Sequence, residues 1–146
     1  MIERATIALR DATAADAERL ASLFTDEGFP VGASGVAARL ERFAAPGSHV
    51  VVADVEGEVL GFIALHVVHR FEGDEPFVRI VALVVDPGVR ERGVGRMLMD
   101  EAEGIGRREG ALFVEVTVGH HRAEARHLFE SRGYDGTLTT YLRKRL

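Results

Sequence analysis

A glycine-punctuated, arginine-rich segment is the part of this chain best suited to chemistry. It reads Arg90-Glu91-Arg92-Gly93-Val94-Gly95-Arg96. If a helix starts here, its first backbone N–H groups lack partners, and its macrodipole places about half a positive charge at that end. The arginines add charge of the same sign, which costs about 0.3–1 kcal/mol each unless an anion is bound. The pattern therefore predicts an anion site, and Gly93 and Gly95 would let the main chain approach a bulky phosphate.

Two other phosphate-binding motifs are excluded by the residues that follow the glycines. A dinucleotide-binding G-x-G-x-x-G motif needs a third glycine where this chain has Leu98. A P-loop needs Lys and then Ser or Thr after its last glycine, whereas Val94 and Gly95 follow Gly93. The alternative interpretation is a plain glycine turn with solvated arginines around it. The strand pattern before the motif and the helix pattern after it favour the anion site.

The flanking segments predict a strand and a helix that would position this motif. The run Phe77–Val85 is apolar except for Arg79, which is typical of a strand buried on both faces. Asp86-Pro87-Gly88 would end that strand. After the motif, helical spacing predicts a helix that ends at Arg107, Arg108 and Glu109, with Gly110 as its left-handed cap; the spaced residues are Val94, Met97, Leu98, Ala102 and Ile105.

The remaining segments predict the rest of one α/β (α+β) domain over residues 1–146, with the order β-α-α-β-β-β-α-β-α-β. They are a strand Thr6–Arg10, a helix capped by Thr13 and Asp16, a helix capped by Ser34, a hairpin of His49–Val55 and Glu58–His69, a loop Phe71–Pro76, a strand Ala111–Val118, a helix with Ala125, Leu128 and Phe129 closed by Gly133, and a strand Leu138–Arg143.

Composition narrows the possible classes of function. The 146 residues are 47% hydrophobic and 28% charged, which fits one self-sufficient core. The absence of cysteine excludes disulfides, thiolate catalysis and Cys-ligated zinc, and the net charge of −5 argues against a nucleic-acid partner. We expect a cytoplasmic protein without a membrane partner, because no apolar run approaches about 18 residues and Met1–Arg10 lacks signal-peptide features.

The histidines do not have the spacing of metal ligands. His66 and His69 lie three residues apart on a predicted strand, so their side chains point to opposite faces. His120 and His121 are adjacent and poorly placed to chelate one ion. The sequence therefore predicts no metal site.

The motif and its surroundings resemble the GCN5-related N-acetyltransferases (GNAT), whose signature is R-x-x-G-x-G. Here that signature is Arg90 to Gly95, and a second family motif is matched by Ala125, Phe129, Gly133 and Tyr134. The resemblance implies a mixed, mostly antiparallel, twisted sheet flanked by helices. From Gly61 to Leu146 the chain is most similar to small-amine acetyltransferases of the aminoalkylphosphonate and aminoglycoside types.

This resemblance implies an acyltransferase that uses acetyl-CoA as co-substrate to acetylate a primary amine of a small molecule. Main-chain amides of residues 92–96 would hold the pyrophosphate, and Leu83–Val85 would pair with the pantetheine arm. A backbone N–H near Val84 or Val85 would stabilise the oxyanion as the amine attacks the thioester directly. The implied coenzyme-binding residues are Leu83, Val84, Val85, Arg90, Arg92, Gly93, Val94, Gly95, Arg96, Arg122 and Phe129.

The chain departs from the family at the positions of the general base and acid. Where relatives often have a glutamate on the fourth strand, the matching positions hold Arg79, Val81 and Ala82, and Phe129 replaces a frequent tyrosine. We expect Glu115 or His120 as base and Tyr134 as acid. Other candidates are His66, His69, Glu72, Asp74, Glu75, His121 and Tyr141.

These departures keep other functions open. One alternative is a module that binds or senses acyl-CoA with little or no turnover, and another is a phosphate-sensing nucleotide module. The acceptor is equally open. The acidic loop at Glu72, Asp74 and Glu75 would attract a cationic amine, whereas Arg70, Arg79 and Arg122 would receive a phosphonate or carboxylate. The short C-terminal strand is one route to a homodimer.

Overall fold

A computed structural model describes residues 7–120 and 122–146, and for Arg90 and Glu91 the backbone alone. The chain divides into two compact units, Met1–Val116 and Thr117–Leu146. Within the described ranges, every helix is too short or too polar to span a bilayer.

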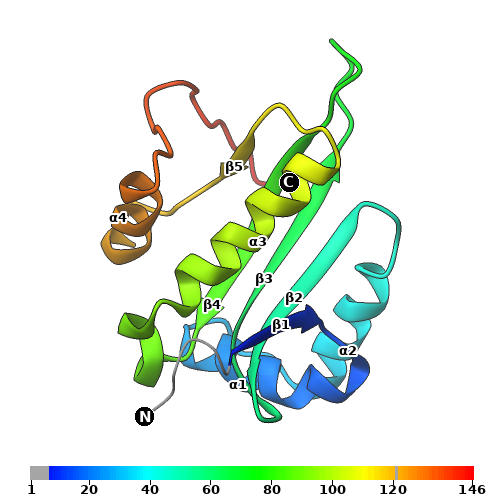
Figure 1. Ribbon diagram of the computed structural model, residues 1–146, viewed down its shortest axis with the longest axis vertical. Helices are drawn as coiled ribbons and strands as arrows, with labels where there is room; N and C mark the ends of the chain where they lie inside the picture. The colour runs from blue at the N-terminus through cyan, green and yellow to red at the C-terminus, as the bar shows by residue number, and fades with distance from the viewer. Residues whose placement is uncertain (1–6, 121) are drawn as a thin grey trace. The chain divides into compact units, whose positions relative to one another are not determined.

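A five-stranded sheet forms the centre of the first unit, with the order β1-β2-β3-β4-β5 (Figure 1). The first four strands pair antiparallel, whereas β5 runs parallel to β4. This confirms the predicted mixed, mostly antiparallel sheet. The strands are β1 (Ala8–Asp11), β2 (Ser48–Val55), β3 (Glu58–Val68), β4 (Phe77–Val85) and β5 (Val114–Val116).

Helices cover both faces of this sheet. On one face, α1 and α2 bury residues such as Leu20 and Val36 against Val52, Phe62 and Val84. On the other face, α3 crosses β3 and β4 (Figure 1). The first unit's helical segments are η2 (Ala14–Asp16), α1 (Ala17–Asp26), α2 (Ala33–Arg42), η3 (Pro87–Arg92) and α3 (Val94–Arg108).

The sequence predicted several element ends correctly. The bounds of β4 are the predicted ones, and Gly110, with φ +72°, follows α3 as expected. At the start of the first helical segment, the Thr13 N–H donates to Asp16 Oδ2 at 2.7 Å, as the predicted cap requires. These ends of strands and helices were therefore predictable from local polar residues and glycine.

Two predictions for the first unit were wrong. The second helix begins at Ala33 with Gly32 as its cap, because extended Gly32 takes the capping position before the chain reaches Ser34. Strand β4 is not buried on both faces, since Arg79 and Val81 are exposed. The core residues that pack on α1 and α2 come from the other half of this strand, at Ala82 and Val84.

The second unit contains α4 (Ala123–Ser131), followed by Gly133 at φ +90°. The predicted strand Leu138–Arg143 was wrong, because the described residues of this unit contain no strand at all. A strand needs a hydrogen-bonded neighbour, and residues 122–146 provide none. The order found is therefore the predicted one without its last strand, and β5 is shorter than the predicted Ala111–Val118.

Candidate active site

The turn from β4 into α3 presents main-chain donors. Gly93 is the N-terminal cap of α3 and has φ +82°, a left-handed conformation that side-chain-bearing residues rarely adopt. Because glycine has no side chain, it leaves the N–H groups of the first turn without a side-chain cap. Met97 N–H already bonds the Gly93 carbonyl at 3.0 Å, so the donors of Val94, Gly95 and Arg96 head the helix.

The charges around this helix end suit an anion. The first turn of α3 contains no acidic residue, and the side chains of Arg92 and Arg96 are exposed. Gly95 is buried, so the main chain of this first turn packs closely against the residues around it. The side chain predicted at Arg90 lies outside the described part of the chain. Uncapped donors, the helix dipole and two exposed guanidinium groups together make a phosphate-binding arrangement.

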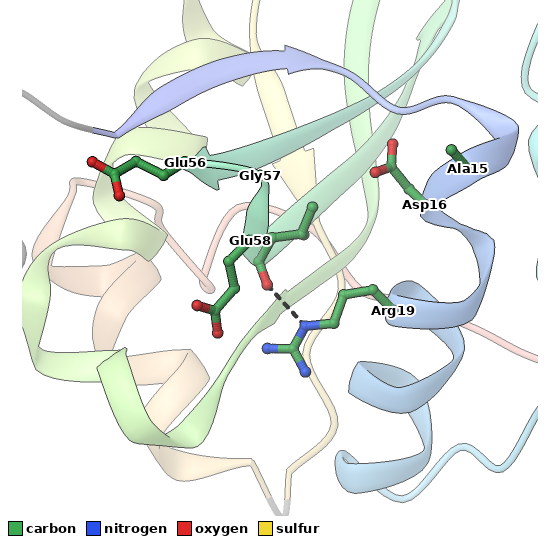
Figure 2. A pocket seen from close by; sticks show the side chains of 7 residues that line it. Ala15, Asp16, Arg19, Glu56, Gly57 and Glu58 are labelled. Carbon is green, nitrogen blue, oxygen red and sulfur yellow. Dashed lines mark hydrogen bonds between the residues drawn. The ribbon is translucent and has the colours of Figure 1, made fainter.

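Arg19 of α1 connects this turn to the sheet. Its Nη2 donates to Asp86 Oδ2 at 2.6 Å, and its Nε donates to the Val59 carbonyl at 2.9 Å, the bond drawn in Figure 2. Asp86 Oδ1 in turn accepts the Gly88 N–H at 2.8 Å and so caps η3. The start of the turn is therefore bonded to both α1 and β3.

The outer edge of β4 opens where β5 ends. The β4–β5 ladder joins only Val78–Ile80 to Val114–Val116, so Val81–Val85 extends beyond it. In the β3–β4 register, Ala64 pairs with Ala82 and Leu65 pairs with Ile80, which leaves Val81 as the extra residue of a β-bulge. Pairing between β4 and β5 thus ends at Ile80.

The hydrogen-bond alternation of β4 determines which donors face this opening. Asp86 N–H bonds the Leu60 carbonyl at 2.8 Å, so Val84, two residues earlier, also directs its N–H toward β3. Leu83 and Val85 direct theirs toward the opposite edge. Of the two N–H groups predicted near the acetyl carbonyl, only that of Val85 therefore points away from β3, as does that of Leu83.

A row of polar side chains crosses the sheet on the face that α1 and α2 cover elsewhere. The strand registers align Ser48 with His66, His66 with Arg79, and Arg79 with Glu115; we call these four residues the polar row. Ser48 Oγ lies 3.0 Å from His66 Nδ1. Arg79 Nε donates to Glu115 Oε1 at 2.8 Å, and Arg79 Nη2 contacts the same oxygen. Glu115, predicted as a base, is thus ion-paired.

The other predicted site residues fall in the second unit. Arg122 is the N-terminal cap of α4, and its N–H bonds the Gly119 carbonyl at 2.9 Å. The rings of Phe129 and Tyr134 lie 5.9 Å apart, which is a packing contact. His120 is exposed, and His121 lies outside the described residues.

The acidic loop between β3 and β4 is organised around Arg70. Arg70 Nη1 donates to the Glu75 carbonyl at 3.3 Å and lies 3.7 Å from the Glu75 carboxylate, and its Nε lies 4.0 Å from Glu72. His69 follows β3 and is exposed, as is Asp74. Arg70 therefore binds its own loop, so the phosphonate contact suggested for it would compete with these bonds.

A cavity of about 440 Å³ lies between the start of α1 and the β2–β3 hairpin. Figure 2 shows residues that line it. Its charged lining consists of Asp16, Arg19, Glu56 and Glu58. Three carboxylates against one guanidinium make it unsuited to phosphate groups. Arg19 lines this cavity and also bonds Asp86 of the β4–α3 turn, but no residue of that turn is among the lining residues. Across the described residues, no three His, Asp or Glu side chains gather as metal ligands.

Sequence reasoning missed Arg19, Ser48 and Phe43. Arg19 is one arginine on a predicted helix, and nothing in its spacing signals a bond to Asp86, 67 residues away. The Ser48 hydroxyl contacts His66 because the two strands are in register, and the Phe43 ring stacks on the same imidazole. Neither contact can be read from the sequence, because both form only when the sheet is assembled. The predicted residues Leu83 to Val85 and Arg92 to Arg96, in contrast, lie on one continuous path from β4 into α3.

Comparison with known proteins gives the family. The model of the Acetyltransferase (GNAT) family matches residues 15–134. YhfO, an uncharacterized N-acetyltransferase of Bacillus subtilis strain 168, is 30% identical over 98 residues, which are 67% of this chain and 64% of YhfO. The chain thus spans slightly less than two thirds of that relative.

Solved structures share the fold. A transcriptional regulator from Bacillus halodurans C-125 matches with a TM-score of 0.85 at 16% identity, covering 96% of this chain and 99% of the other. The aminoglycoside N-acetyltransferase AAC(6')-Iy in complex with CoA matches with a TM-score of 0.80 at 20% identity, covering 96% and 95%. With the family match across most of its length, this chain belongs to the acetyltransferase (GNAT) family.

Proposed function

We propose that this protein is an acetyl-CoA-dependent N-acetyltransferase that acetylates a primary amine of a small molecule. The observation that carries the proposal is the continuous path from the open edge of β4 to the uncapped start of α3. One end of that path offers an N–H for a thioester carbonyl, and the other offers several for a diphosphate.

The coenzyme would lie along this path. Main-chain amides from Arg92 to Arg96 would bind the pyrophosphate, with the guanidinium groups of Arg90, Arg92 and Arg96 adding charge. The pantetheine arm would run beside Leu83–Val85, where the β5 ladder has ended. Arg122 and Phe129, the other predicted coenzyme-binding residues, belong to the second unit. The fold neighbour AAC(6')-Iy is described with bound CoA, which supports this assignment.

The chemistry needs positioning more than reactive side chains. An outward N–H of Leu83 or Val85 would stabilise the oxyanion that forms when the amine attacks the thioester, and loss of one such donor costs about 10²–10³ in rate. No covalent enzyme intermediate is required, which fits a chain without cysteine. Thiolate is a tolerable leaving group because an ordinary thiol pKa is about 8.5.

Proton transfer is the demanding step. An alkylamine with a pKa of about 10.4 is protonated at neutral pH, so its deprotonation costs roughly 4–5 kcal/mol. Glu115 and His120 are candidates for the base, and Tyr134 is a candidate for the acid. Taking up a proton would cost Glu115 its ion pair with Arg79, which makes that role expensive.

We further propose that the acceptor belongs to the aminoalkylphosphonate or aminoglycoside class. Support comes from AAC(6')-Iy, also described in complex with the bisubstrate analogue CoA-S-monomethyl-acetylneamine. The polar row presents a cation and a carboxylate side by side at Arg79 and Glu115, which suits an acceptor with both an ammonium and an anionic or hydroxyl-rich part.

Thiol release from acetyl-CoA tests the proposal. We expect release only when an amine is added, from a panel containing 2-aminoethylphosphonate, kanamycin and simple alkylamines. Tight acetyl-CoA binding without release for any amine would instead favour an acyl-CoA-sensing module, the alternative that Arg79 and Phe129 suggest. Thermal stabilisation by ATP but not by acetyl-CoA would contradict both and favour a nucleotide module.

A further inference from the structure

We propose that His66 is the general base that removes a proton from the acceptor amine, an inference that rests on the proposed acetyl transfer. His66 lies on β3 in the polar row, directly opposite Arg79 in the register. Arg79 in turn bonds Glu115 of β5. His66 is therefore one strand away from the pair of charges that we propose to bind the acceptor.

The imidazole of His66 is held on two sides. Ser48 Oγ lies 3.0 Å from Nδ1, and the Phe43 ring stacks on the imidazole with centroids 4.6 Å apart and planes inclined by 24°. When Nδ1–H donates to the Ser48 hydroxyl, Nε2 carries the lone pair. A base whose second nitrogen is fixed by an orienting partner is a recurring catalytic arrangement.

The other members of the polar row are less suited to accept the proton. Arg79 is permanently charged and has no acceptor atom. Glu115 bonds Arg79 through Oε1, so its protonation would break an ion pair. From β2 the group facing His66 is Ser48, from the end of α2 it is Phe43, and from β4 it is Arg79. Because Glu115 neutralises Arg79, His66 faces a neutral pair rather than a bare cation.

The spacing along β3 allows His66 to reach the amine through water. His66 lies three residues along β3 from Ile63, which pairs with Leu83, so roughly 10 Å of strand separates its position from that of the outward N–H. The acetyl group, the attacking nitrogen and one bridging water would fill that interval. A general base can remove a proton either directly or through one bridging water.

The proton balance is complete without another reactant. The ammonium acceptor loses one proton through water to Nε2 of His66, which becomes an imidazolium and later releases that proton to solvent. The neutral amine forms the C–N bond with the thioester carbonyl, and the C–S bond then breaks. The nitrogen loses its second proton to the departing sulfur, so the products are the amide, CoA thiol and one proton in solution.

Steady-state kinetics of His66→Gln test the proposal, with acetyl-CoA and the fastest amine among 2-aminoethylphosphonate, kanamycin and simple alkylamines. We expect kcat to fall about 10²-fold with the KM for acetyl-CoA unchanged. The pH profile of kcat/KM should lose the part of its acidic limb that belongs to the histidine, while the part from the amine remains. The control is His49→Gln, which removes a histidine from the opposite face of β2.

Ser48 acts through His66 and is a positioning residue. Ser48→Ala should lower kcat about tenfold, and Ser48→Thr should restore most of it because the hydroxyl returns. Nitrogen chemical shifts of His66 in the wild-type protein give a second readout that needs no variant. We expect Nδ1 to carry the proton and Nε2 to be bare at pH 7.5.

The outcomes separate this inference from the proposed function. A wild-type protein that acetylates no amine overturns the acetyl transfer and the base together. An active wild type whose rate and pH profile survive His66→Gln overturns only the base. A proton found on Nε2 rather than Nδ1 at pH 7.5 also overturns it, even where the variant fails to fold.

Discussion

The two ends of β4 build their parts of the candidate site in different ways. At its C-terminal end, one continuous segment from Leu83 to Arg96 offers main-chain N–H groups around Gly93. Toward its N-terminal end, the polar row takes one side chain from each of four strands, β2 to β5. The first end depends on backbone conformation, and the second depends on strand register.

This difference determines how each end responds to substitution. Main-chain donors survive most side-chain changes and fail where the backbone needs glycine. The polar row instead requires that neighbouring strands stay aligned, because a shift of one residue turns a side chain to the other face. The extra residue Val81 reverses the direction of the side chains within β4. Val78, before the bulge, contacts α3 at Gly106, whereas Val84, after the bulge, packs with α1 and α2.

The largest effect is expected at Gly93. Gly93→Val forces a β-branched residue into a left-handed conformation, φ +82°, and places a side chain beside the donors of α3. We expect acetyl-CoA binding to weaken by at least about 100-fold, measured by calorimetry, with the far-ultraviolet circular dichroism retained.

Gly110 provides the matched control. It has φ +72° at the other end of α3, and a Cβ there would meet no atom within 4 Å. Gly110→Val should therefore reduce thermal stability to a similar degree while acetyl-CoA affinity stays unchanged. Equal affinity losses in the two variants would show that Gly93 acts through folding alone. They would contradict a coenzyme-binding role for the segment from Leu83 to Arg96, which we call the phosphate end.

A second test concerns the bonds that hold the phosphate end in place. Arg19→Gln removes the 2.6 Å bond to Asp86 and the bond to the Val59 carbonyl, so the turn before η3 loses its connection to α1. We expect about a tenfold rise in the KM for acetyl-CoA with kcat little changed. Arg107→Gln, which loses only a surface pair with Glu103, is the control. A fall in kcat alone would contradict this role.

The same distinction explains how far sequence reasoning succeeded. The course of the segment from Leu83 to Arg96, from strand through turn into helix, was predictable because strand, turn, glycine and helix follow one another within about a dozen residues and each leaves a local signal. His66 was considered only as one of several histidines, since its alignment with Ser48 and Arg79 exists only in the paired sheet. The predicted strand Leu138–Arg143 was wrong because β propensity does not provide a partner strand.

Glu115 tests the other end of β4. If it serves to neutralise Arg79, Glu115→Gln should raise the KM for the amine several-fold and leave the acidic limb of the pH profile in place. If Glu115 is itself the base, kcat should fall about 10²-fold and that limb should change. Comparison with His66→Gln, under identical buffer and amine, decides which side chain of the polar row takes the proton.

The smallest effect on catalysis is expected at Asp16, which touches neither end of β4. Its carboxylate receives two bonds of 2.9 Å from Arg10 and one of 2.7 Å from the Thr13 N–H. The side-chain bond from Arg10 is the main reason that the pKa of Asp16 lies below its usual value of 3.8. The stabilisation is therefore fully present above about pH 4 and is lost as the pH falls through the lower pKa of the folded state.

Asp16→Asn should thus lower the free energy of unfolding at pH 7 by about 1–3 kcal/mol, measured by urea denaturation, with kcat and both KM values unchanged. The difference from wild type should narrow below pH 4, because the wild-type carboxylate then becomes neutral as well. Asp54→Asn, which removes the other carboxylate on Arg10, provides a second measure of the same network. A stability difference that stayed constant down to pH 2 would mean that Asp16 acts through the shape of the cap rather than through its charge. A change in acetyl-CoA affinity would mean that coenzyme binding also depends on the start of α1.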